Sequence, residues 1–212
     1  MKIYKVLNED RSCCNGGSGT WKLNEWREVE GKLVLCENGF HLCDGELHLL
    51  KWLGQAIYEA EYDGEIVRGD DKVVVRKARI IRKLDAWNER TARLFACDCA
   101  EHVLHIFENE YPDDNRPRKV IEVARRYANG EVNEEEWDAA WAAAWDAARD
   151  AASAAAWAAA RDAAWAAAWA AARDAARDAA SAAAWAAARD AEKEWQAKRL
   201  RYYLGGEDDT QD

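Results

Sequence analysis

Tryptophan and arginine recur at every fourth position along the alanine-rich last third of the chain. Between Trp137 and Asp190 the large or polar residues keep this spacing, and alanine fills most positions between them. A Trp–Arg pair four residues apart on a helix can place a guanidinium over an indole face. Indole stacking and forked guanidinium hydrogen bonds suit a planar anion such as a nucleotide. The alternative is that the rings fill gaps between alanine helices while each arginine pairs with a nearby aspartate.

We take a set of these residues, with one histidine of the first half, as candidate ligand- or partner-binding side chains. They are Trp157, Arg161, Trp165, Trp169, Arg173, Arg177, Trp185 and His41. No arrangement of residues indicates catalysis with any specificity. We therefore expect no catalytic residue, no metal and no cofactor.

The spacing of four also predicts how the alanine-rich region folds. Alanine is the strongest helix former, and each step of four residues rotates the stripe by about 40° around a helix. The stripe stays on one side for only about 12 to 16 residues, which favours two to four antiparallel helices over one long rod. The segment Asp146–Ala163 recurs unchanged at Asp174–Ala191, which fits a stacked repeat, expansion of a short DNA unit, or both.

The first part of the chain has the pattern of a small, mainly antiparallel sheet. Asp63-Gly64 predicts a tight turn between its last two strands, and Gly45–Gly54 predicts one or two helical turns. The expected strands are Lys2–Leu7, Lys32–Leu35, Ala56–Tyr62 and Lys72–Ile81.

Two helices are expected between the sheet and the alanine-rich region. The first begins after a cap at Asp85 and reaches about Glu108, and the second spans about Arg116 to Ala128. Asn129-Gly130 is typical of a helix C-terminus. The fold class is α+β, with a small α+β domain (1–84), an all-helical bundle with alanine and tryptophan tetrads (85–204) and an acidic tail (205–212).

Charge and hydropathy exclude several classes of protein. A formal net charge of −10 argues against general nucleic-acid binding, which needs clustered Lys and Arg, but is compatible with a basic partner. The longest apolar stretches fall short of the roughly 20 residues that cross a bilayer. Met1 leads into a predicted strand rather than a signal peptide, so we expect a cytoplasmic protein. If a phage encodes it, this is the cytoplasm of the host. We expect the cysteines to be reduced there.

Two clusters of cysteine and histidine could hold zinc. For the cluster at 36–48, packing of the local turn is the favoured interpretation, and a Cys–His nucleophilic pair is a further alternative. For the cluster at 97–105, burial in a helical core is favoured. The clusters are Cys36, His41, Cys43 and His48, and Cys97, Cys99, His102 and His105.

Three elements in the helical half, CDCAE (97–101), YPDDNRPRK (111–119) and EWQ (194–196), resemble those of immunity-5-like immunity proteins of bacteria and phages. The resemblance runs from near Ala92 to Leu204. That family is all-helical and found near polymorphic toxins and in phage genomes, and it has no established catalytic residues, so the resemblance implies binding without turnover. Residues 1–84 more loosely resemble a phage and bacterial domain of unknown function, through YKV (4–6), LCENGFHLC (35–43) and a basic last strand.

These observations favour a non-catalytic binding protein of bacterial or phage conflict. It would act in immunity or counter-defence, by sequestering a toxin, a host defence protein or a nucleotide signal. A second hypothesis is an enzyme that modifies a nucleotide or protein with Tyr4, His41 and Glu59. A third is a structural protein whose exposed tryptophans drive assembly into a homo-oligomer.

Overall fold

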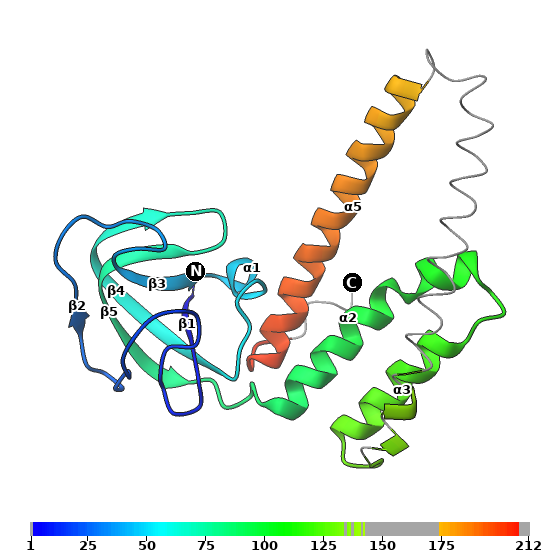
Figure 1. Ribbon diagram of the computed structural model, residues 1–212, viewed down its shortest axis with the longest axis horizontal. Helices are drawn as coiled ribbons and strands as arrows, with labels where there is room; N and C mark the ends of the chain where they lie inside the picture. The colour runs from blue at the N-terminus through cyan, green and yellow to red at the C-terminus, as the bar shows by residue number, and fades with distance from the viewer. Residues whose placement is uncertain (1, 134, 137, 141, 143–173, 208–212) are drawn as a thin grey trace. The chain divides into compact units, whose positions relative to one another are not determined.

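The computed structural model describes residues 2–133, 135–136, 138–140, 142 and 174–207 (Figure 1). Its contacts group the chain into two units. One consists of Met1–Ala92 with Lys193–Asp212, and the other of Arg93–Glu192. The fold is α+β, as the sequence predicts, with a β-rich N-terminal part and helices after it.

An antiparallel sheet forms the centre of the first unit. Strand β1 pairs with β3 and β4, while β5 pairs with β4 along one edge and with β3 and β2 along the other. The order β1–β4–β5–β3–β1 therefore closes into a small barrel, seen in Figure 1. The elements are β1 (Ile3–Leu7), β2 (Arg27–Glu28), β3 (Phe40–Asp44), α1 (Glu46–Leu49), β4 (Ala56–Arg68) and β5 (Val73–Lys83).

Both faces of the barrel strands are buried. Side chains alternate along a strand, so Leu7, Tyr58 and Val75 lie in the interior cluster with Trp21, whereas Tyr4, Val6 and Ile57 occupy the opposite face and are also buried. Other parts of the unit must therefore shield the outer face from solvent. Residues of α1, of the last turns of α5 (Asp174–Tyr203) and directly after α5 belong to the same unit and are buried too: Leu49, Ala197, Leu200, Tyr203 and Leu204.

The predicted strand at Lys32–Leu35 is wrong. A bridge between Val34 and Asn38 closes a tight turn there, with Cys36 at φ 68°. The side-chain amide of Asn38 holds this loop by donating to the carbonyl oxygens of Glu30 and Lys32, at 2.9 and 3.0 Å. The apolar residues of the segment thus pack as a loop, and the neighbouring strands are β2 and β3.

The predicted turn at Asp63-Gly64 is also wrong, because β4 continues through it to Arg68. The pairing with β5 shifts register between Asp63 and Ile66, and Gly64 has φ 80°. Glycine with positive φ is typical of a β-bulge. The chain reverses instead at Gly69–Lys72, where the Gly69 amide donates to the Lys72 carbonyl at 2.9 Å.

Helix α2 (Glu89–Glu110) begins later than predicted. Asn88 and Thr91 exchange hydrogen bonds between side chain and backbone, at 2.9 and 3.1 Å. This reciprocal cap satisfies free amides at the first turn, so Asn88 caps the helix in place of the predicted Asp85.

Helix α3 (Arg116–Ala128) has the predicted bounds. Gly130 takes φ 74°, and the amides of Gly130 and Glu131 bond back to Tyr127 and Arg126, which is the Schellman termination that Asn129-Gly130 indicates. Its contact with α2 has a small core of Cys97, Leu104 and Ile121.

Helix α5 is a single helix of 30 residues, longer than the 12 to 16 residues over which the stripe stays on one side. It ends like α3, with Gly205 at φ 88° and the Gly206 amide bonded to the Arg201 carbonyl. The number of helices that the alanine-rich region forms lies outside the described residues.

Gly39 sits where the loop enters β3, and we predict that Gly39→Ala destabilises the barrel by roughly 1–3 kcal/mol. Its φ is 123°, and an added Cβ would lie 2.3 Å from Val74 Cγ2. Gly64→Ala is the matched control, since it also has positive φ but no atom within 4 Å, and should cost only about 1 kcal/mol. Urea unfolding followed by circular dichroism measures both, and equal losses would contradict the packing at Gly39.

Candidate functional site

Most of the predicted tetrad residues lie outside the described part of the chain: Trp157, Arg161, Trp165, Trp169 and Arg173. Arg177 and Trp185 belong to α5, but their side chains lie outside the described ones. The binding role of all seven stays a prediction. His41 is the one predicted binding residue with a described side chain.

His41 lies on β3 and borders a cavity at one end of the barrel. Its Nε2 accepts a hydrogen bond from the Cys36 amide at 2.8 Å, so Nε2 is the unprotonated ring nitrogen. Burial lowers the pKa of His41, and the charges of Lys5 and Lys72 lower it further. The ring is therefore neutral at pH 7 and holds the preceding turn in place.

The first cysteine–histidine cluster has structural roles in this geometry. Cys43 is buried, and burial raises the pKa of its thiol to about 12, which leaves it protonated and a poor nucleophile or metal ligand. His48 Nδ1 accepts from the Asp44 amide at 3.2 Å. Among the described residues, no three His, Cys, Asp or Glu side chains are grouped to hold a metal ion.

The second cluster divides between core and surface. Cys97 is buried between α2 and α3, as predicted, and burial raises the pKa of its thiol. The two histidines of the cluster are exposed, so the prediction that they lie in the core is wrong. His102 Nδ1 contacts Glu192 Oε2 at 2.6 Å, and His105 Nδ1 lies 3.1 Å from the His102 carbonyl oxygen.

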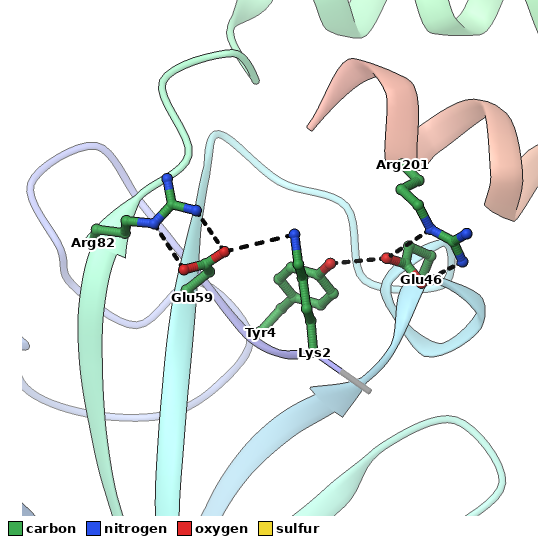
Figure 2. A network of polar contacts seen from close by, with 6 residues as sticks. All are labelled: Lys2, Tyr4, Glu46, Glu59, Arg82 and Arg201. Atoms are coloured by element: carbon green, nitrogen blue, oxygen red, sulfur yellow. Dashed lines mark hydrogen bonds and ion pairs between the residues drawn. The ribbon is translucent and has the colours of Figure 1, made fainter. Parts of the chain in front are cut away.

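The three residues of the enzyme hypothesis have separate partners. Tyr4 and Glu59 are opposite each other on β1 and β4, yet the Tyr4 hydroxyl donates to Glu46 Oε1 at 2.9 Å. Glu59 accepts two hydrogen bonds from Arg82, both 2.7 Å long, as Figure 2 shows. With His41 bound to its own loop, the described geometry does not bring the three together.

Glu46 connects β1 to the C-terminal end of α5. Arg201 Nε and Nη2 approach its two carboxylate oxygens at 3.4 and 3.3 Å (Figure 2). Burial acts to raise the pKa of Glu46, but the hydrogen bonds from Arg201, the backbone and Tyr4 outweigh it, so the pKa is lowered. Burial and the bond to Glu46 raise the pKa of Tyr4 well above its usual value, which keeps the phenol protonated.

Sequence reasoning missed this connection because Glu46 and Arg201 are 155 residues apart. The nearest local signal is the Gly205-Gly206 pair, which ends α5 and fixes where Arg201 stands on its last turn.

Sequence reasoning also missed the residues that line the cavity beside His41. This cavity of about 560 Å³ lies among β1, β3 and the loops that join the strands, and the basic and aromatic side chains on its wall include Lys5, Trp21, Arg27, Phe40, Trp52 and Lys72. Arg27 lies over the rings of Trp21 and Phe40, with its Cζ 4.8 and 5.3 Å from their centroids. The cavity is therefore lined with hydrogen-bond donors and positive charge.

Comparison with known families covers nearly the whole chain. Residues 82–203 match the family described as Imm-5 like putative immunity protein, and residues 1–93 match the domain of unknown function DUF7666. The chain belongs to the Imm-5 like immunity protein family. No curated protein and no solved structure matches it.

The immunity family covers α2, α3 and α5, whereas the cavity and His41 lie in the DUF7666 domain. The match supports an immunity-type role for the helical part and assigns nothing to the barrel. Where the structure describes a helix, none is both long and apolar enough to span a membrane.

The Glu46 connection predicts a pH dependence of stability. Since the folded-state pKa of Glu46 lies below its ordinary 4.5, its contribution is complete above pH 4.5 and is lost as the pH falls through the lower folded-state value. Glu46→Gln should therefore be about 1 kcal/mol less stable than the wild type at pH 7, with the gap closing below pH 4.5.

Urea unfolding between pH 7 and pH 3 measures this gap. Glu25→Gln is the control, because Glu25 is exposed on a loop and pairs with Lys22 three residues away. A gap for Glu46→Gln that stays constant over this range would show that its carboxylate charge contributes nothing to folding.

Proposed function

We propose that this chain neutralises a toxin by binding it in a stoichiometric complex without turnover. The family match over residues 82–203 carries the proposal, because it covers the whole helical part. A host defence protein and a nucleotide signal are the alternative partners, and identification of the co-purifying molecule decides among the three.

The distribution of charge supports a basic partner. Residues 93–192 contain 19 acidic and 11 basic side chains, so this stretch carries a net −8 of the chain's −10. A field of one sign speeds association with a partner of opposite charge and disfavours partners of like charge. The acidic excess thus lies within the immunity family region and is nearly absent from the barrel.

Arginines of α3 form ion pairs with acidic side chains of α2. Arg118 makes a forked pair with Glu108 at 2.7 and 2.8 Å, and Arg125 lies 2.6 Å from Asp98 and also contacts Glu101. These internal pairs neutralise the basic side chains. The acidic surplus next to them includes the exposed side chains of Glu131, Glu135 and Asp138.

Reversing those three charges should weaken toxin binding. We predict that Glu131→Lys, Glu135→Lys and Asp138→Lys together reduce affinity at least tenfold at low salt, with a smaller effect at high salt because surface charges are screened. Isothermal titration calorimetry with the toxin recovered by pull-down measures this. The control reverses Glu25, Glu28 and Glu30, which are exposed in the barrel unit, and equal losses in both variants would contradict binding by the helical part.

The tetrad residues provide a second test of the same proposal. Trp165→Ala, Trp169→Ala and Arg173→Ala together should preserve helix content, because alanine is the better helix former, and should weaken toxin capture. The matched control is Trp141, Trp145 and Arg149 to alanine, which has the same residue types and spacing. Circular dichroism and pull-down measure helix content and capture. Loss of helix content along with binding would assign the first three residues to the core.

Two measurements separate this proposal from its rivals. A sequestering protein inhibits its toxin in proportion to the amount added, whereas an enzyme acts at far less than one equivalent. Light scattering at several dilutions tests assembly: large oligomers that resist dilution would favour the structural hypothesis, and a monomer would favour the binding protein.

A further inference from the structure

The cavity in the barrel unit has the size of a small-molecule site. Its volume of about 560 Å³ lies within the range of roughly 300–1,000 Å³ typical of such sites. Its wall combines the loop at 13–18, the turn at 36–41 and interior residues of the barrel. The family match at residues 1–93 gives this part of the chain no function.

Positive charge dominates the cavity wall. Three of its charged side chains are basic, Lys5, Arg27 and Lys72, and Glu37 is acidic. The neutral His41 ring adds no charge. A cation would be repelled here, while an anion would meet several donors within one enclosure.

Two residues that line the cavity each have a buried donor with no hydrogen-bond partner among the described residues. The donors are Trp21 Nε1 and Arg27 Nη1, and Trp21 is only 1% exposed. An indole N–H and a guanidinium N–H can donate but cannot accept. A buried donor without a partner destabilises the folded protein, so a ligand that supplies an acceptor would be stabilised by hydrogen bonds to these groups.

Lys5 is a third donor that lines the cavity, and its side chain points into the barrel. It alternates with the outward-facing Tyr4 and Val6 on β1, and its ammonium lies 5.3 Å from the Trp21 ring centroid. The ammonium donates to the His41 carbonyl at 3.0 Å, which uses one of its three protons. Burial lowers the pKa of Lys5, and a bound anion would offset that effect by stabilising the charged form.

We propose that this cavity binds a small organic anion through a phosphate or carboxylate group held by Arg27, Trp21 Nε1 and Lys5. The cavity is larger than one such group, so the anion is part of a molecule of metabolite size. This ligand site lies in the barrel and is independent of toxin binding by the helices.

Titration of the full chain with inorganic phosphate, AMP, citrate and adenosine at millimolar concentration tests the proposal. The readouts are the melting temperature and the NMR resonance of the Trp21 indole N–H, assigned with Trp21→Phe. At least one anion should raise the melting temperature and move the indole proton downfield, and neutral adenosine should do neither. A response to AMP or phosphate identifies a phosphate site, and a response to citrate a carboxylate site.

Arg27→Gln should reduce the affinity for the responding anion at least tenfold. Arg79→Gln is the matched control: its guanidinium also stacks on a tryptophan, Trp26 at 4.6 Å, but its N–H groups already bond to Glu61. Lys72→Gln, at the cavity wall, repeats the test if Arg27→Gln melts below the wild type without ligand. The proposal would be overturned if none of the three anions shifts the Trp21 indole resonance, or if the cavity variants bind the responding anion as tightly as the wild type.

Discussion

Burial of the last turns of α5 within the barrel unit is the contact on which the rest of the structure depends. Leu200 is fully buried, and Ala197, Tyr203 and Leu204 are nearly so. Burying a leucine stabilises by about 1.5–3 kcal/mol, whereas an ion pair as exposed as Arg201–Glu46 contributes about 1 kcal/mol or less. The apolar surface therefore holds the end of the chain, and Glu46 with Tyr4 fixes its orientation.

This contact decides how the chain is divided. Residues 193–206 match the immunity family almost to their end, yet they group with the barrel. In chain order, the helical unit thus lies between two segments of the barrel unit. The acidic excess belongs to the helical unit and the donor-lined cavity to the barrel, so the two proposed binding activities rest on different residues and can be altered separately.

The sequence predicts those parts of the fold that short-range rules determine. The bounds of α3 follow from Pro117 and the Asn129-Gly130 cap, and three of the four predicted strands overlap β1, β4 and β5. The loop at 31–39 could not be predicted, because side-chain bonds from Asn38 decide it. The residues that line the cavity were harder to predict than the fold. Lys5 at an inward position of β1 is a local signal, but the approach of Trp21 and Arg27 to it depends on closure of the barrel.

Hydrogen exchange measured by mass spectrometry on the full chain, wild type against Leu200→Ala, tests most directly whether the end of α5 and the barrel form one cooperative unit. Leu47→Ala is the control, because Leu47 is exposed on α1. We expect Leu200→Ala to lower protection in β1, β4 and residues 197–204 by the same factor, and Leu47→Ala to leave all three unchanged. Loss of protection in residues 197–204 alone, with β1 and β4 as protected as in the wild type, would contradict it.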